Sequence, residues 1–145
     1  MIAVTPDAWR NTIRQLQECG RGRRECVVYW LSAVGANHVD EVAHPDHMGL
    51  PGYYEVDSKW FHRFWVDLDH RGRSVVAQVH THAGRAFHSV TDDEGAIVQV
   101  PGFLSIVLPG FAMLDDCLKD GYIARLGLDG VFKPAELESA IRFIS

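Results

Sequence analysis

The spacing of hydrophobic residues in the first third of the chain predicts one helix followed by a pair of strands. Thr5-Pro6-Asp7 is typical of a helix start, because it combines a hydroxyl cap, a proline in the first turn and an acid. Apolar residues then recur at helical spacing as far as Gly20, where the helix should end. Residues 25–34 are rich in β-branched and aromatic side chains and predict a buried strand, with residues 39–43 as its partner.

A second helix and a second strand pair are predicted beyond this point. Residues 44–54 are rich in proline and glycine and predict a loop. Asp57 or Ser58 caps the next helix, which ends at 71–73, and residues 74–82 form a strand. The helix carries an aromatic cluster that we expect in the core: Trp60, Phe61, Phe64 and Trp65.

The remaining residues complete an interleaved order of helices and strands. Thr91 opens a capping box before a short helix that ends by Pro101. Strands are predicted at residues 103–108, 122–126 and 131–132, and a closing helix at residues 134–144. This order predicts the α/β class (or α+β), with a mixed β-sheet flanked by helices. Because no repeat or linker interrupts it, the whole chain, 1–145, is treated as a single domain.

Composition narrows the classes of partner and the compartment. The 145 residues carry a formal net charge of −5, which argues against nucleic acid or an anionic membrane as the main partner, since both reward a basic surface. No apolar run reaches the roughly 18 residues of a membrane span. The first residues also lack the basic-then-apolar pattern of a secretory signal. We therefore expect a cytoplasmic protein.

The number and spacing of the cysteines argue against a fold that depends on disulfides. There are 3 of them, and no two form a CxxC pair, so we expect neither a disulfide framework nor a cysteine-rich zinc site. Cys26 lies inside an apolar run and is interpreted as a small core residue.

The chemistry is concentrated around a His-x-His pair. His80 and His82 lie two residues apart on a predicted strand, so both imidazoles can point at one ion. A short loop then leads to Ser89 and Asp92 at a predicted helix start, where the helix dipole keeps a carboxylate ionised. Two histidines and one carboxylate leave a tetrahedral zinc with one open position, as in catalytic sites. A His-x-His pair by itself is more often two strand histidines that bind no metal. Two further features favour the metal site here. One is the Ser-x-x-Asp pattern, and the other is Glu25, which lies upstream at the start of an apolar strand.

These residues together resemble the JAMM motif of JAB/MPN-domain metalloproteases. The motif consists of a glutamate before a hydrophobic strand, His-x-His, a short loop and Ser-x-x-Asp, and the resemblance extends from the first helix to about residue 115. It implies the MPN/JAB fold, a three-layer arrangement like that of cytidine deaminases. It also implies a zinc-dependent isopeptidase or peptidase that cleaves after the tail of a ubiquitin-like protein. The compact chain with His-Ser-x-Thr-Asp-Asp is most similar to the prokaryotic JAB branch.

The resemblance assigns a role to each residue of the motif. His80, His82 and Asp92 would bind Zn²⁺, Glu25 would hold the catalytic water as general base, and Ser89 would donate a hydrogen bond to the developing oxyanion.

Two departures from the family pattern affect this assignment. Ala83 replaces the usual proline after the second histidine and should loosen the loop. The loop is also one residue shorter than the commonest spacing, so counting from His82 reaches Asp93, whereas counting from Ser89 reaches Asp92. We prefer Asp92, because it shares a helix start with Ser89, and Asp93 stays the alternative.

The sequence leaves three functions open. The first is cleavage after a ubiquitin-like tail, with that protein as substrate and conjugation-system enzymes as further partners. The second is a non-catalytic MPN-type scaffold, although such scaffolds have usually lost ligands that are all present here. The third is a zinc amidohydrolase acting on a small amide. Residues 44–54 are expected to border the substrate groove. Residues 100–111 could form the opposite border, although most of them are interpreted as a core strand. The arginines at 21, 23 and 24 are either part of a solvated turn or could meet an acidic partner tail.

Overall fold

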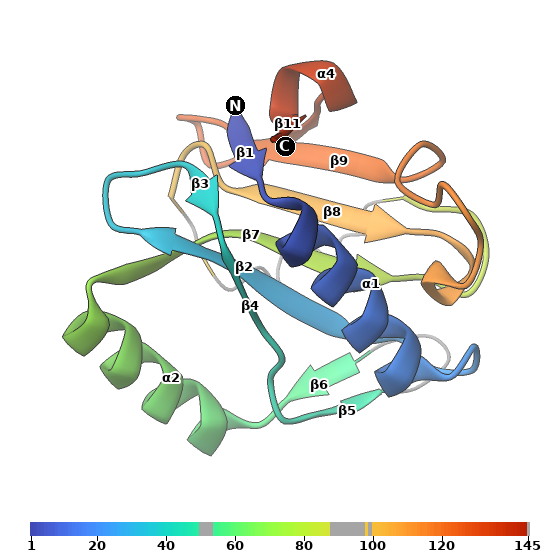
Figure 1. Ribbon diagram of the computed structural model, residues 1–145, viewed down its shortest axis with the longest axis horizontal. Helices are drawn as coiled ribbons and strands as arrows, with labels where there is room; N and C mark the ends of the chain where they lie inside the picture. Colours follow the sequence, from blue (N-terminus) through green and yellow to red (C-terminus); the bar gives the residue numbers. More distant parts are fainter. Residues whose placement is uncertain (50–53, 88–97, 99, 145) are drawn as a thin grey trace.

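The fold is built around a mixed sheet of six strands (Figure 1). In this computed structural model the described residues are 1–49, 54–87, 98 and 100–144. Only β7 and β8 run parallel among the neighbouring pairs of this sheet within the described residues. The sheet confirms the predicted class. Its strands, in spatial order, are β10 (Phe132–Pro134), β9 (Tyr122–Leu126), β8 (Leu104–Leu108), β7 (Arg73–Thr81), β2 (Val27–Ala33) and β4 (Glu41–Ala43).

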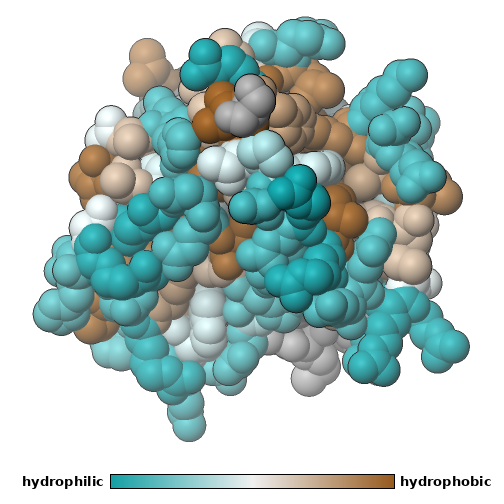
Figure 2. Space-filling model, viewed as in Figure 1, coloured by the Kyte–Doolittle hydropathy of each residue, from teal (hydrophilic) through white to brown (hydrophobic). Residues whose placement is uncertain are grey.

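Helix α1 (Pro6–Gly20) covers one face of the sheet. It begins where predicted, because the Thr5 hydroxyl accepts a hydrogen bond from the Ala8 amide at 3.1 Å. Its buried side packs on β2, where the indole nitrogen of Trp30 donates to the Thr12 hydroxyl at 2.8 Å. Figure 2 shows the molecule from the same direction as Figure 1. Hydrophilic residues cover most of this face, and hydrophobic residues are visible between them.

Helix α2 (Ser58–Arg71) packs against the opposite face. Asp57 caps it and Gly72 ends it in a left-handed conformation, φ 63°, as the sequence predicts. Phe64 stacks on Tyr29 with ring centroids 5.9 Å apart. The predicted aromatic core cluster is confirmed except for Trp65, which is 40% exposed.

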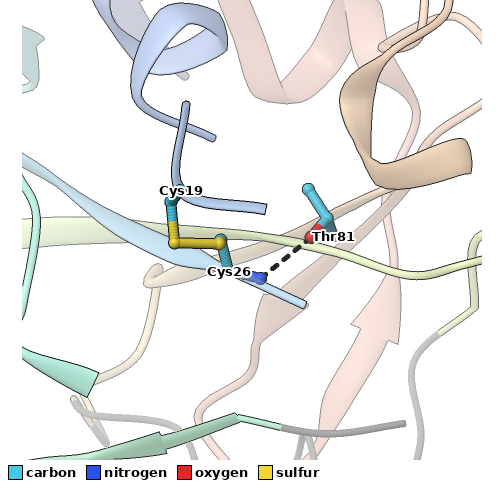
Figure 3. Close-up of a disulfide and its surroundings, with 3 residues drawn as sticks. All are labelled: Cys19, Cys26 and Thr81. Carbon is cyan, nitrogen blue, oxygen red and sulfur yellow. Dashed lines mark hydrogen bonds between the residues drawn. A yellow bond between two sulfur atoms is a disulfide. The ribbon is translucent and has the colours of Figure 1, made fainter. Parts of the chain in front are cut away.

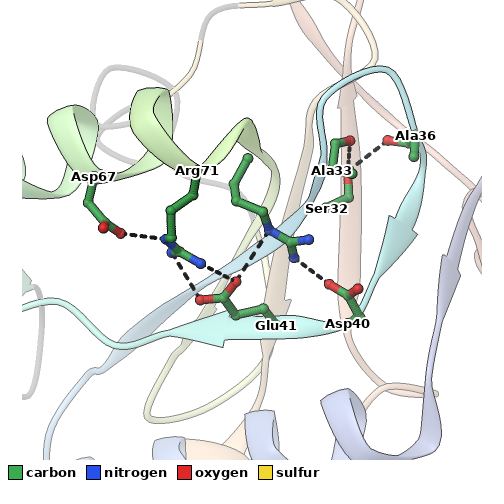
Figure 4. A network of polar contacts seen from close by, with 8 residues as sticks. Ser32, Ala33, Ala36, Asp40, Glu41, Asp67 and Arg71 are labelled. Atoms are coloured by element: carbon green, nitrogen blue, oxygen red, sulfur yellow. Dashed lines mark hydrogen bonds and ion pairs between the residues drawn. The ribbon is translucent and has the colours of Figure 1, made fainter.

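Charged side chains tie the end of α2 to the edge of the sheet (Figure 4). Arg71 donates to both carboxylate oxygens of Glu41, at 3.0 and 3.1 Å, and to Asp67 at 2.8 Å. Arg73, at the start of β7, contacts Asp40 and lies 3.3 Å from Glu41. The hydrogen bond from Arg73 lowers the pKa of Asp40 below its usual value. The network therefore joins α2, β7 and β4.

The two ends of the chain meet in a second, parallel sheet. Its order is β11 (Ile141–Phe143), β1 (Ile2–Val4) and β3 (His38–Val39). The predicted closing helix is wrong over most of its length, since only α4 (Leu137–Ala140) is helical. The last residues pair with β1 instead, and Ile141 lies opposite Ile2.

Three further short elements complete the description. Strand β5 (His47–Gly49) lies within the predicted loop at 44–54, and β6 (Tyr54–Val56) begins at its last residue; the two form an antiparallel pair. A single 3₁₀ turn, η1 (Gly110–Ala112), follows β8. Most of the helix predicted from Thr91 lies outside the described residues, and residues 98 and 100, which are described, are not helical. Over the part of the chain that is described, no helix combines the length and apolar character needed to cross a membrane.

Candidate active site

The two histidines of the His-x-His motif lie together at the end of β7. His80 is fully buried and His82 is 7% exposed. Their ring centroids are 5.2 Å apart. The ring of Phe87 packs edge-on against His82, with centroids 4.7 Å apart. Two neighbouring imidazoles can supply two of the four ligands of a tetrahedral metal site.

The neighbouring strand β8 fixes the backbone that carries these histidines. His80 lies opposite Val107 in the parallel pairing of β7 and β8. The His82 amide donates to the Leu108 carbonyl at 2.9 Å, and the His82 carbonyl accepts from the Phe111 amide at 2.9 Å. Two hydrogen bonds, one to β8 and one from the turn that follows β8, thus fix the main chain of His82.

Glu25 lies just before β2, which runs antiparallel to β7. Val27 is opposite His80, so their side chains share a face, and two-residue alternation directs Glu25 toward that face. The carboxylate residue is 7% exposed. The register therefore brings Glu25 to the end of the sheet where His82 lies, although the two are 57 positions apart in the chain.

The other predicted site residues lie outside the described part of the chain. Ser89, Asp92 and the alternative Asp93 are among them, so their roles stay predictions. Within the described residues, no three His, Cys, Asp or Glu side chains gather closely enough to hold a metal ion. The donor set is nevertheless suited to zinc, because imidazole nitrogen and carboxylate oxygen are both ligands that zinc prefers.

A disulfide between Cys19 and Cys26 corrects the expectation from the cysteine pattern (Figure 3). The turn after α1 brings the helix end beside the start of β2, with the two Cα atoms 6.3 Å apart. This proximity depends on tertiary structure and is not visible in the spacing. Cys26 is nevertheless fully buried in the core, as predicted. Cys117 is free and buried, and burial raises the pKa of its thiol.

We expect the disulfide to contribute to stability. Its partners are 7 positions apart, and closing so short a loop contributes about 2 kcal/mol in the chain-entropy treatment. Cys19→Ala should therefore lower Tm by roughly 4–8 °C, as measured by calorimetry. Reductant should shift wild-type Tm by a similar amount and leave the variant unchanged. Equal Tm values for wild type and variant without reductant would contradict this expectation.

The turn between α1 and β2 also forms a basic hollow. The hollow has a volume of about 510 Å³. Among the described residues, none of its three guanidinium groups forms an ion pair. Backbone bonds from the amides of Arg23 and Arg24 to the Gly20 carbonyl, at 2.9 and 3.1 Å, fix the turn. The lining residues are Glu18, Cys19, Gly20, Arg21, Arg23 and Arg24.

Part of the sequence is similar to that of a probable metalloprotease. It is 38% identical over 86 residues to a probable metalloprotease of Sinorhizobium fredii, a match that covers 59% of this chain. The chain spans about half, 52%, of the length of that curated relative. No family model matches the sequence.

Solved structures with a similar fold cover nearly the whole chain. A protein from Desulfitobacterium hafniense matches with a TM-score of 0.72 at 16% identity, covering 99% of this chain and 93% of the other. A protein from Salinibacter ruber matches with a TM-score of 0.60 at 18% identity, covering 93% and 89%.

A third solved structure identifies the fold. It is a JAB1/MPN domain protein from Archaeoglobus fulgidus, with a TM-score of 0.51 at 11% identity, covering 100% of this chain and 98% of the other. The comparisons confirm the resemblance seen in the sequence: the chain has the JAB1/MPN fold and is similar over 86 residues to a probable metalloprotease.

Proposed function

We propose that this protein is a zinc-dependent isopeptidase or peptidase that cleaves after the C-terminal tail of a ubiquitin-like protein. The observation that carries the proposal is the placement of Glu25 at the end of the sheet where two buried histidines lie together, one near the end of β7 and one just after it: His80 and His82. The JAMM resemblance and the similarity to a probable metalloprotease support the reaction class.

Each site residue has a defined chemical task in this proposal. His80 and His82, with Asp92 (or Asp93) as the third ligand, would hold the metal. Zinc, when bound, polarises a carbonyl group and acidifies water. Glu25 takes a proton from the attacking water and then delivers it to the leaving amine, which is general base and then general acid catalysis. The Ser89 hydroxyl donates a hydrogen bond to the negative oxygen that develops on the substrate.

A cleavage assay tests this function directly. Purified protein is incubated with a linear ubiquitin-like fusion and with the same tail joined to a lysine side chain, and products are identified by mass spectrometry. We expect cleavage after the tail, its loss with a chelator and its return with zinc. Cleavage of small amides alone would favour the amidohydrolase. Zinc-loaded protein without any hydrolysis would favour the scaffold.

We propose that the basic hollow next to Glu25 binds an acidic segment of the substrate. Three exposed arginines occupy four consecutive positions in a chain whose net charge is −5. Arginine pairs with carboxylates through two parallel hydrogen bonds. A hollow of about 510 Å³ accommodates a few side chains, which favours a short acidic segment over an extended polyanion.

Charge reversal in this hollow should weaken substrate binding. Arg23→Glu/Arg24→Glu should raise KM about 3- to 10-fold, because each rim charge contributes a modest attraction. The value of kcat should stay within twofold, and 0.5 M salt should reduce the difference between variant and wild type. Lys119→Glu/Arg142→Glu makes the same change in charge on other exposed residues and serves as the control. An equal rise of KM in both double variants would contradict the docking role.

A cytoplasmic location and conjugation-system enzymes as partners complete the proposal. Disulfides are rare in a reducing cytosol, so the bond between Cys19 and Cys26 makes the compartment testable. Trapping thiols with an alkylating agent in intact cells, followed by mass spectrometry, reports the state of both cysteines. Alkylated Cys19 and Cys26 are expected in the cytoplasm, and an intact bond would argue for an oxidising compartment.

A further inference from the structure

We propose that Thr81, the residue between the two histidines, is a positioning residue that orients Glu25 toward the metal site. This inference rests on the proposed function. It assigns no contact with substrate to Thr81, whose side chain lies on the α1 face of the sheet with Cys26, away from the face that Val27 shares with His80.

The observation behind this inference is an unusual hydrogen bond between Cys26 and Thr81, at the end of the β2–β7 pair (Figure 3). The Thr81 amide donates to the Cys26 carbonyl at 3.1 Å, as in an ordinary antiparallel pair. The Cys26 amide, however, donates to the Thr81 hydroxyl at 3.0 Å, where an ordinary pair would use the main-chain carbonyl. Both residues are almost completely buried, with exposures of 0% and 1%.

This hydrogen bond acts on Glu25 through the peptide plane. The Cys26 amide and the Glu25 carbonyl belong to one planar group, so fixing the direction of that N–H fixes the backbone of Glu25 as well. Ladder pairing of β2 with β7 begins only at Val27. The Thr81 hydroxyl therefore provides a restraint that extends the strand geometry to the glutamate.

The disulfide and the hydrogen bond from the Cys26 amide restrain different parts of Cys26. The sulfur of Cys26 is bonded to Cys19 of α1, which secures the side chain on the α1 face (Figure 3). When the hydroxyl is removed, the buried Cys26 amide loses its acceptor, and the peptide plane must turn to find another. We infer that Cys26 stays in place and that Glu25 changes direction.

The histidines should not follow this change, because β8 holds them from the other side. His82 is bonded through its amide to Leu108 and through its carbonyl to Phe111. His80 is paired with Val107. A variant that lacks only the hydroxyl should therefore keep its metal and lose catalytic efficiency, which separates positioning of Glu25 from assembly of the metal site.

Thr81→Val and Thr81→Ser form the matched pair for the test. Valine preserves the shape and removes the hydroxyl, whereas serine preserves the hydroxyl. With Thr81→Val we expect unchanged zinc content by elemental analysis, a kcat about 10- to 100-fold lower and KM within twofold of wild type. Thr81→Ser should recover kcat to within about threefold. Amide hydrogen exchange at Cys26 should accelerate in Thr81→Val and not in Thr81→Ser.

Several results would overturn the proposal. These are wild-type kcat in Thr81→Val, loss of zinc in that variant, or a serine variant as impaired as the valine one. If wild-type protein cleaves no ubiquitin-like fusion, the proposed function fails. Amide hydrogen exchange at Cys26 still tests whether the Thr81 hydroxyl restrains this peptide group. Unchanged protection of the Cys26 amide in Thr81→Val would then refute it.

Discussion

Glu25→Gln should lower kcat by about 10²- to 10⁴-fold, the range typical of a lost general base. Glutamine has nearly the same shape as glutamate and cannot accept a proton from water, so the chemical step is affected more than folding. KM should stay within a few-fold, because the tail of the substrate does not depend on this carboxylate for binding. Initial rates on a ubiquitin-like fusion measure both constants.

Two controls separate this loss from indirect effects. Zinc content should equal that of wild type, because Glu25 is not among the predicted metal ligands. Glu138→Gln makes the same chemical change at an exposed position of α4 and should leave the rate unchanged. A Glu25→Gln protein with more than a tenth of wild-type kcat would contradict the assignment of the base.

His82→Ala should abolish zinc binding together with hydrolysis. Removing one of two protein imidazoles from a three-ligand site lowers its affinity steeply, and zinc per chain should fall from about one to nearly zero by elemental analysis. The metal-dependent gain in stability should vanish too. At a free metal concentration 100 times Kd, this gain is about 2.7 kcal/mol for wild type, and it appears as a rise in Tm on addition of zinc.

The control for this prediction is a histidine elsewhere on the surface. His70→Ala, on the exposed side of α2, should keep both the metal and the rise in Tm. Stoichiometric zinc in His82→Ala would exclude this residue as a ligand. Loss of zinc in both variants would instead indicate adventitious binding to surface histidines.

The parts of the fold with strong local signals were predictable from the sequence. Capping residues mark both long helices: Thr5 before α1 and Asp57 before α2 both make the expected bonds. The strands β7, β8 and β9 follow from β-branched runs bounded by turn residues. The His-x-His pair was also readable, because alternation along a strand is a local property.

The features that the sequence did not reveal depend on contacts between distant segments. Ile141 and its neighbours have the apolar spacing of a helix, and Ala140 and Ile141 are buried. Their backbone becomes a strand because β1 offers an unpaired edge at that place. Two further contacts likewise form only once α1, β2 and β7 have assembled. They are the disulfide between Cys19 and Cys26 and the hydrogen bond from the Cys26 amide to the Thr81 hydroxyl.

The joining of the chain ends in β1 and β11 has a consequence for the order of synthesis. Each residue of β1 pairs with a residue of β11 that lies 139 positions later in the chain, as Ile2 does with Ile141. One edge of β1 therefore lacks β11 while these positions are translated, at a typical rate of about 5–20 residues per second. In that interval one edge of a short apolar strand stays open to other chains, so the nascent protein needs protection at this edge.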